Sequence, residues 1–208
     1  MKRPLYPLFL DLQDRPVLVV GAGTVGTHKI QALLTAGAAV TVVAPKVTDQ
    51  IAVAAERGAL RWHKRPFVTA DLDGVYFVIA ATNDHRVNAE VAKAAAAARL
   101  FVNAVDDPSS ASAYASACIV RGGVTVAISS GGRAPAVSRL LRELLEQVLP
   151  SDETLADWIE RAASLRTQWQ NENIPLPERY RDLLRRLLHR EPLAQTAIPS
   201  GDTQEPAA

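Results

Sequence analysis

Three glycines near the N-terminus have the spacing of a loop that holds a diphosphate. They lie in Gly21-Ala22-Gly23-Thr24-Val25-Gly26, a GxGxxG pattern. An apolar strand is expected directly before the pattern and a helix directly after it, which is the context that a dinucleotide-binding loop requires. Gly21 allows a tight turn, Gly23 allows close approach of the backbone to the pyrophosphate, and Gly26 allows the helix to pack on the strand. N–H groups at the helix N-terminus then bind the diphosphate. The alternative is a turn with incidental glycines.

The residues after the second expected strand leave the choice between NAD and NADP open. A carboxylate about 20 residues beyond the glycines usually binds the ribose of NAD. Ala44, Pro45 and Lys46 occupy that place here. Without an acid the 2′-phosphate of NADP is not repelled, and Lys46 could contact it. Backbone groups around Pro45 could still hold the ribose of NAD.

Alternating apolar strands and amphipathic helices predict the scaffold that positions this loop. The expected strands are residues 16–20, 39–44 (ended by Pro45), 60–64, 75–81 and 100–105, and the expected helices are 24–36, 48–57 and 85–98. This alternation is typical of βαβ units. Right-handed crossovers then predict an α/β fold with a Rossmann-type doubly wound parallel sheet of strand order 3-2-1-4-5. Ligands are expected at the carboxyl ends of the strands.

The pattern changes after Asp106. Strands are expected at 117–121 and 124–129 around Gly122-Gly123, as a hairpin. Pro135 opens a helix that runs to about Leu149, and two more helices are expected near 152–170 and 177–190. We therefore divide the chain into a Rossmann domain (1–110), a small α+β element (111–150), a helical domain (151–190) and a tail (191–208) whose composition predicts disorder.

The overall composition excludes several other classes of protein. The 208 residues carry a net charge of +1 and contain no long apolar run, so neither nucleic acid nor a membrane is expected as a partner. The single cysteine, Cys118, excludes an internal disulfide and indicates a reducing compartment, so we expect a cytoplasmic protein. Cys118 itself is expected to be a small buried residue within a strand. The four histidines have no paired metal-binding spacing.

Several motifs together resemble the precorrin-2 dehydrogenase and sirohydrochlorin ferrochelatase family, the N-terminal module of siroheme synthases. They are PLFLDLQDRPVLVVGAGTVGTHKIQALLTAGAAVTVVAP, DLDGVYFVIAATND, VNAEV, FVNAVDDP and VAISSGGRAPAVSRLLRELLE. Their combination in this order carries the resemblance, because each piece alone is unspecific. The resemblance covers roughly residues 5–149.

This resemblance implies NAD-dependent oxidation of precorrin-2 to sirohydrochlorin, in siroheme or cobalamin biosynthesis. Some members of the family also insert ferrous iron, Fe2+, as ferrochelatases. The resemblance further implies a homodimer, with the hairpin and helix of 117–149 as its dimerisation element. The residues expected to bind the cofactor are Gly21, Gly23, Thr24, Val25, Gly26, Pro45, Lys46, Ala81 and Thr82.

Asp106 matches the family's key carboxylate, proposed as general base and as a transient metal ligand. It follows the fifth expected strand and so lies at the ligand-facing edge of the sheet. Oxidation of a tetrapyrrole precursor removes a hydride and a proton, and a carboxylate near the cofactor can accept the proton. Neighbouring Asp107 could raise the pKa of one of the pair through its like charge. Alternatively, both residues only cap the turn before Pro108.

The serine–glycine loop before the helix at Pro135 is the expected substrate site. In the family its second serine, here Ser130, lies at the active site and can carry a phosphate. The helix N-terminus beyond Gly131 could bind a substrate carboxylate, and Arg133 and Arg121 could pair with others, because precorrin-2 is a polycarboxylate. A glycine-rich start of a helix and solvated arginines are the alternatives.

Two departures from the family pattern lie near the expected tetrapyrrole pocket. Family members typically have a segment of the type SFIFPA where this chain has SAYASA (112–117), and an aspartate often stands where Arg121-Gly122 stands here. These differences bear on chelation and substrate identity more than on cofactor binding. Two other functions therefore stay open, a non-catalytic dinucleotide sensor and a metal chelatase without dehydrogenase activity.

Overall fold

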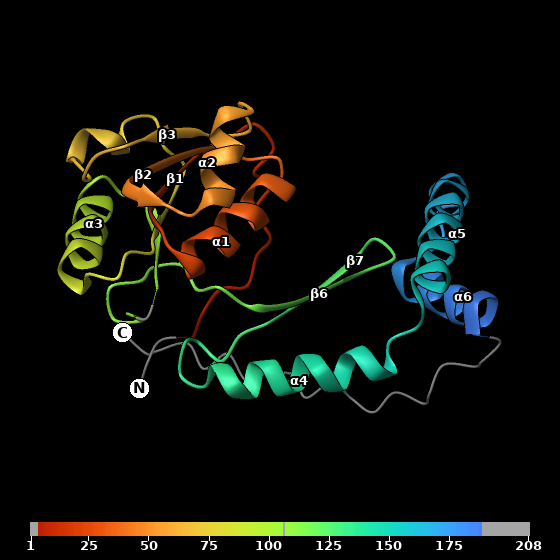
Figure 1. The fold of residues 1–208 in the computed structure, drawn as a ribbon. Coiled ribbons are helices and arrows are strands. Elements are labelled where there is room, and N and C mark those ends of the chain that lie inside the picture. Colours follow the sequence, from red (N-terminus) through yellow and green to blue (C-terminus); the bar gives the residue numbers. More distant parts are fainter. Residues whose placement is uncertain (1–3, 106, 189–208) are drawn as a thin grey trace, which may run out of the picture. The chain divides into compact units, whose positions relative to one another are not determined.

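A five-stranded parallel sheet of order β3-β2-β1-β4-β5 forms the centre of the first of two compact units (Figure 1). The computed structural model describes residues 4–105 and 107–188. The strands are β1 (Pro16–Ala22), β2 (Ala39–Val47), β3 (Arg61–His63), β4 (Phe77–Ala80) and β5 (Phe101–Ala104). They are connected through α1 (Thr24–Thr35), α2 (Asp49–Glu56), the short 3-10 helix η1 (Thr69–Leu72) and α3 (His85–Ala97). The fold class and strand order predicted from the sequence are therefore confirmed.

Alternate residues of β1 enter two separate apolar clusters. Val17 and Val19 pack with α1 and α2 on one face of the sheet, whereas Leu18 and Val20 pack with η1 and α3 on the other (Figure 1). These side chains are at most 2% exposed. Burying one such side chain contributes about 1.5–3 kcal/mol. A strand covered on both faces needs apolar residues at every position, which explains the continuous run PVLVV.

Strand β2 continues past Pro45, contrary to the sequence prediction. Its pairing with β3 ends at Val43, and its pairing with β1 resumes at Val47, opposite Ala22, after an irregularity between Val20 and Ala22. Proline has no N–H to give to a neighbouring strand. The edge strand β3 does not reach Pro45, so the missing N–H disrupts no pairing there.

The second unit contains the hairpin and most of the C-terminal helices. Of the described residues, it comprises 118–127 and 141–188, so the division falls within α4 (Pro135–Val148). The hairpin strands are β6 (Ala117–Arg121) and β7 (Val124–Ile128), and the last helices are α5 (Asp152–Asn171) and α6 (Leu176–Leu188). Trp169 of α5 is 8% exposed, and its indole N–H donates to Asp182 of α6 over 2.9 Å. The expected tail lies outside the described residues.

Cys118 corrects one expectation. Its side chain is exposed, because it lies on the outer face of β6, whereas the next residue, Ile119, is 4% exposed. Side chains alternate along a strand, so the apolar run alone did not show which face would be covered.

Among the described residues, no helix is long and apolar enough to cross a membrane.

Candidate active site

The switch point where β1 and β4 lead to opposite faces of the sheet brings together most of the residues expected to bind the cofactor. β1 leads into α1 on one face of the sheet and β4 leads into α3 on the other. Such a switch point is where open α/β sheets bind ligands, at the carboxyl ends of the strands. The strands pair up to Val20 and Ala80, and Ala81 still donates its N–H to the carbonyl of Val20 over 2.8 Å. Beyond that point, the glycine loop and the segment from Ala81 lie against each other. They border the place where an open α/β sheet has its ligand crevice, and we call them the two sides of this expected crevice.

Gly21 and Gly26 are required by packing within the chain itself. Gly21 has φ +91°, and a Cβ there would lie 2.5 Å from the carbonyl oxygen of Ala81 and 2.8 Å from the nitrogen of Thr82. A Cβ on Gly26 would lie 2.6 Å from the carbonyl oxygen of Gly21. The expected roles of these two glycines, the tight turn and the close helix–strand contact, agree with this geometry.

Gly23 has no such internal reason to be a glycine. Its φ is −73°, and a Cβ there would meet no atom within 4 Å. Every other glycine in the described part of the chain has a positive φ or a neighbour that a Cβ would strike. Gly23 is the N-cap of α1, and no side chain caps this helix end. The result is bare backbone facing open space at a helix N-terminus, which fits a diphosphate.

The segment that carries Pro45 and Lys46 is tied to the glycine loop. The hydroxyl of Thr48 lies 2.9 Å from that of buried Thr27 in α1, and the N–H of Thr48 donates to the carbonyl of Ala22 over 3.3 Å. The indole N–H of Trp62 donates to the carbonyl of Ala44 over 2.9 Å, which anchors the end of β2 to β3. Pro45 and Lys46 are both exposed at this edge. The structure therefore leaves them accessible to a ligand held by the glycine loop.

Asn88, which the sequence analysis missed, anchors the other side of the crevice. It is 2% exposed, and its carboxamide oxygen accepts from the N–H of Thr82 over 3.0 Å and from its hydroxyl over 2.8 Å. Its NH2 group donates to the carbonyl of Thr82 over 3.0 Å. A sequence signal existed, because Asn88 begins the stripe at three- and four-residue spacing that continues through Val91, Ala92 and Ala95.

The expected base, Asp106, lies outside the described residues, but Asp107 does not. One carboxylate oxygen of Asp107 accepts from the hydroxyl and N–H of Ser109 and from the N–H of Ser110. The bonds from Ser109 and Ser110 lower the pKa of Asp107 to about 2. Asp107 is therefore not the member of the pair with a raised pKa. It caps the turn around Pro108, which is the alternative role weighed for this residue.

The serine–glycine loop and the turn at Pro108 lie against each other. A Cβ on Gly132 would lie 3.2 Å from Cβ of Pro108 and 3.3 Å from Cδ1 of Tyr114. The Tyr114 hydroxyl donates to the Pro108 carbonyl over 3.0 Å. The structure thus brings together two of the motifs expected at the substrate site. Tyr114, within the segment that departs from the family pattern, had not been assigned a role.

Ser130 closes the N-terminal turn before α4. Its hydroxyl accepts from the N–H of Ala134 over 3.0 Å, and its carbonyl accepts from the N–H of Arg133. Gly131 has φ +62°, a conformation that favours glycine, and Arg133 is exposed. This local geometry matches the glycine-rich helix start weighed as an alternative, and it leaves the expected substrate role of Ser130, Gly131 and Arg133 as a proposal.

Arg121 has a structural set of partners in the second unit. Its guanidinium donates to the carbonyls of Glu146, Leu149 and Pro150 over 3.0–3.4 Å. These carbonyls lie at the C-terminal end of α4, where a cation also interacts favourably with the helix dipole. Arg121 therefore caps α4 in this structure, and we remove it from the set proposed to bind substrate.

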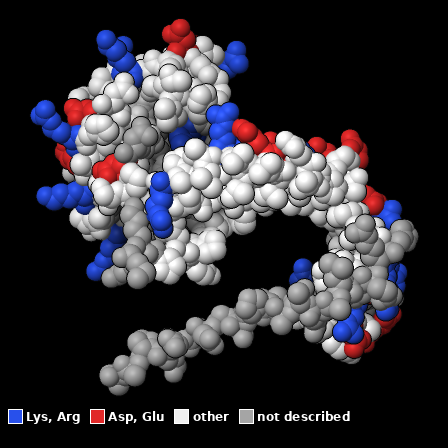
Figure 2. Space-filling model, turned by 90° about the horizontal axis from the view of Figure 1, so that it is seen from below, with Lys and Arg blue, Asp and Glu red and all other residues white. Residues whose placement is uncertain are grey.

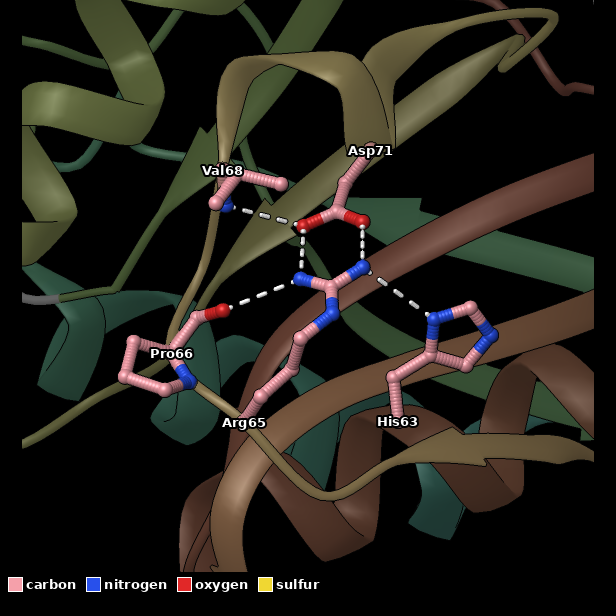
Figure 3. Close-up of polar contacts among 5 residues, drawn as sticks. All are labelled: His63, Arg65, Pro66, Val68 and Asp71. Atoms are coloured by element: carbon pink, nitrogen blue, oxygen red, sulfur yellow. Dashed lines mark hydrogen bonds and ion pairs between the residues drawn. The ribbon is translucent and has the colours of Figure 1, made fainter.

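A separate polar cluster lies at the end of β3 (Figure 3). The guanidinium of Arg65 forms a two-pronged ion pair with Asp71 over 2.8 and 2.5 Å, and it lies 3.3 Å from Nδ1 of His63. Asp71 also accepts from the N–H of Val68 over 2.9 Å. The bonds from Arg65 are the main cause that lowers the pKa of Asp71. This cluster fixes the crossover from β3 to β4.

Across the described residues, no group of three or more His, Cys, Asp or Glu side chains could hold a metal ion.

Comparison with known proteins identifies the family. A family model described as "Putative NAD(P)-binding" matches residues 8–117, more than half of the chain. The chain belongs to this NAD(P)-binding family. A second family model, described as the central part of a sirohaem biosynthesis protein, matches residues 121–147.

The relatives of this NAD(P)-binding chain include several siroheme synthases. It is 42% identical over 197 residues to siroheme synthase 3 of Aeromonas hydrophila, covering 95% of the chain and 41% of that protein. It is 47% identical over 145 residues to siroheme synthase 1 of Cronobacter sakazakii, covering 70% of the chain and 31% of that protein. The chain thus spans less than half the length of these relatives.

A solved structure matches most of the NAD(P)-binding chain. It is that of SirC, a precorrin-2 dehydrogenase, with a TM-score of 0.68 and 29% sequence identity. The match covers 89% of this chain and all of SirC. Together with the siroheme synthases, this match confirms the resemblance predicted from the motifs.

Proposed function

We propose that this chain is an NAD-dependent dehydrogenase that oxidises precorrin-2 to sirohydrochlorin in the synthesis of siroheme. The observation that carries the proposal is the bare backbone of Gly23, which faces open space at the N-terminus of α1 although no internal contact requires a glycine there. The precorrin-2 dehydrogenase SirC, matched over its full length, supports the choice of substrate.

The proposed cofactor site consists of the two sides of the crevice. Gly21, Gly23, Thr24, Val25 and Gly26 present the backbone of the glycine loop to the diphosphate. Pro45 and Lys46 are exposed and are proposed to contact the ribose, and Ala81 and Thr82 are proposed to line the opposite side. When bound, NAD accepts the hydride. The lack of an acid at the end of β2 leaves NADP as a second cofactor, for which Lys46 supplies a cation.

The proposed catalytic residue is Asp106, which accepts the proton that leaves precorrin-2. Asp107, with a pKa of about 2, stays ionised and holds the turn that follows Asp106. Ser130, Gly131 and Arg133 are proposed to bind substrate carboxylates. Their loop packs on the same turn, through Gly132, Pro108 and Tyr114, which supports a shared pocket.

Insertion of Fe2+ to give siroheme is a second proposed activity, with iron as a substrate and Asp106 as its transient ligand. The names of the siroheme synthase relatives favour it over a non-catalytic sensor. The SAYASA segment (112–117) is one of the two departures from the family pattern near the expected pocket, and it bears on this second activity. Because these relatives are named siroheme synthases, we propose that the chain acts in the synthesis of siroheme and not of cobalamin.

We also propose that the chain is a cytoplasmic homodimer in which α4 contributes to the interface. Figure 2 shows the face of α4 turned to the viewer largely free of charged side chains. Five apolar residues of this helix are 44–74% exposed: Val137, Leu140, Leu141, Leu144 and Val148. A stripe of this kind marks an interaction surface. Cys118, the single cysteine of the sequence, is exposed, which is compatible with a reducing compartment.

Anaerobic incubation of the purified chain with precorrin-2 tests the dehydrogenase. We expect sirohydrochlorin and NADH to form in equal amounts, with NADP as a slower acceptor. The variant Asp106→Ala should lose turnover and still bind NADH. Binding of NADH without turnover by the unaltered chain would favour the sensor. Metal insertion into supplied sirohydrochlorin without NAD, in a chain that does not oxidise precorrin-2, would favour a chelatase alone.

A further inference from the structure

We infer that Asn88 is the positioning residue of the cofactor site, because its buried carboxamide holds the Ala81–Thr82 side of the crevice in the conformation that receives the dinucleotide. This inference rests on the dinucleotide site proposed above. Asn88 itself lies behind Thr82, inside the fold at 2% exposure, so it acts through that segment and not by contact with the cofactor.

Asn88 takes the place of a neighbouring strand. β4 pairs with β1 and β5 only as far as Ala80, and the last bonds on either side are from Ala81 to Val20 and from Val105 to Ala80. The N–H and C=O of Thr82 lie past the end of this pairing. The carboxamide of Asn88 accepts from the Thr82 N–H and donates to the Thr82 carbonyl, each over 3.0 Å. Backbone groups that are partly shielded from water and lie beyond a sheet still need partners, and Asn88 supplies both.

The segment held by Asn88 is the surface against which the glycine loop packs. A Cβ on Gly21 would strike the Ala81 carbonyl at 2.5 Å and the Thr82 nitrogen at 2.8 Å, and a Cβ on Gly26 would lie 3.7 Å from the Ala81 Cβ. Backbone groups this close cannot move independently. If the Thr82 peptide rotated, the glycine loop would have to shift with it. Asn88 therefore controls the shape of both sides of the crevice.

Helix stability alone does not account for an asparagine at this position. α3 is already capped by Asp84, whose carboxylate accepts from the N–H of Arg86 over 2.8 Å. The other buried residues of the same stripe, Val91, Ala92 and Ala95, are apolar. A buried polar side chain adds little to packing compared with an apolar one, but it can fix one conformation of the backbone to which it bonds.

A matched pair of variants separates a positioning role from a structural one. Asn88→Ala removes the carboxamide, and Val91→Ala removes apolar volume from the same stripe of α3, where Val91 is fully buried. The Kd for NADH, measured by fluorescence titration, and the Tm are compared with those of the unaltered chain. We expect Asn88→Ala to weaken NADH binding about tenfold or more. Val91→Ala should lower Tm and leave the Kd unchanged.

Two further readouts complete the test. Asn88→Asp keeps the acceptor for the Thr82 N–H but turns a carboxylate oxygen toward the Thr82 carbonyl, which repels it, so its Kd should rise at least as much as that of Asn88→Ala. Asn88→Ser keeps a hydroxyl that is too short to bridge both groups of Thr82, and this variant carries the test if Asn88→Ala does not fold. In turnover, Asn88 variants should raise the KM for NAD and leave the KM for precorrin-2 unchanged. An unchanged Kd in folded Asn88 variants would overturn the inference. Failure of the unaltered chain to bind NADH would instead overturn the proposed function.

Discussion

The hydroxyl oxygens of Thr27 and Thr48 lie 2.9 Å apart and join two segments that are 21 residues apart in the sequence. Thr27 is buried at 5% exposure in the first turn of α1, and Thr48 is the N-cap of α2. The pair holds the glycine loop beside the end of β2, where Pro45 and Lys46 are exposed. The segments proposed for the diphosphate and for the ribose are thus positioned by one hydrogen bond and the adjoining backbone contact.

A double-mutant cycle should measure this coupling. Thr27→Val and Thr48→Val each remove one hydroxyl and keep the shape of the side chain, so each should lower the free energy of unfolding by about 1 kcal/mol. The double variant should lose less than the sum, because the first substitution already removes the shared bond. Urea denaturation of the four proteins gives the numbers. Additive losses would show that the two hydroxyls do not depend on each other.

Gly23→Asp should separate fold stability from cofactor binding. Aspartate is a favoured N-cap residue, and a Cβ at this position meets no atom within 4 Å, so Tm should not fall. The added negative charge at the proposed diphosphate site should weaken NADH binding by about tenfold or more. Calorimetric titration and thermal melting measure the two effects.

Gly26→Ala provides the contrast for that variant. Its Cβ would lie 2.6 Å from the carbonyl oxygen of Gly21, so α1 must shift and the chain should lose about 1–3 kcal/mol of stability. If Gly23→Asp bound NADH as tightly as the unaltered chain, the dinucleotide pocket would have to lie elsewhere.

Asp71 should make the stability of the chain depend on pH in the acid range. Arg65 lowers the pKa of Asp71 in the folded state below its value in the unfolded chain. The unfolded state therefore binds this proton first as pH falls, and the contribution of the pair is present above the unfolded pKa of about 3.9 and is lost below it. Asp71→Asn should flatten this part of the pH dependence, as followed by urea unfolding between about pH 3 and 7.

An exposed aspartate nearby serves as the control for Asp71. Asp73→Asn removes the same charge two residues further along, from an exposed side chain. Asp73→Asn should lower the free energy of unfolding at neutral pH less than Asp71→Asn does. The reason is that the Asp71 side chain is only 7% exposed, so its ion pair with Arg65 is less screened by water than a surface charge is. Equal losses would mean that the bonds to Arg65 contribute nothing measurable.

Leu144→Glu should convert the proposed dimer into a monomer. Leu144 is 50% exposed on α4, and a carboxylate there cannot be buried in an apolar interface without a large desolvation cost. Gln147→Glu adds the same charge to an exposed polar position of α4 and should leave the dimer intact. Light scattering after size-exclusion chromatography gives the mass. A monomeric unaltered chain would remove α4 from the proposal as an interface.

The sequence by itself determined the sheet, the strand order and the glycine loop. Periodicity is a local property: PVLVV, with no polar position, predicts a strand covered on both faces, and the stripe of Ile30 and Leu33 predicts a helix that packs on it. The handedness of βαβ connections then fixes the order of the strands, and β3-β2-β1-β4-β5 is the order observed. The boundaries failed where a neighbour decided them, as at Pro45, since the short length of β3 cannot be inferred from the residues of β2.

Only the tertiary structure decided which partners the polar side chains bond to and which glycines are required by packing within the chain. Asn88 bonds to Thr82, Thr27 to Thr48 and Arg121 to the end of α4, and each of these bonds depends on how the chain returns to itself. The sequence shows Gly21, Gly23 and Gly26 as equivalent members of one motif, whereas the folded chain crowds the first and third and leaves the second open. The physical reason is that periodicity encodes which side of an element is buried, but contact between distant residues arises only when the elements pack.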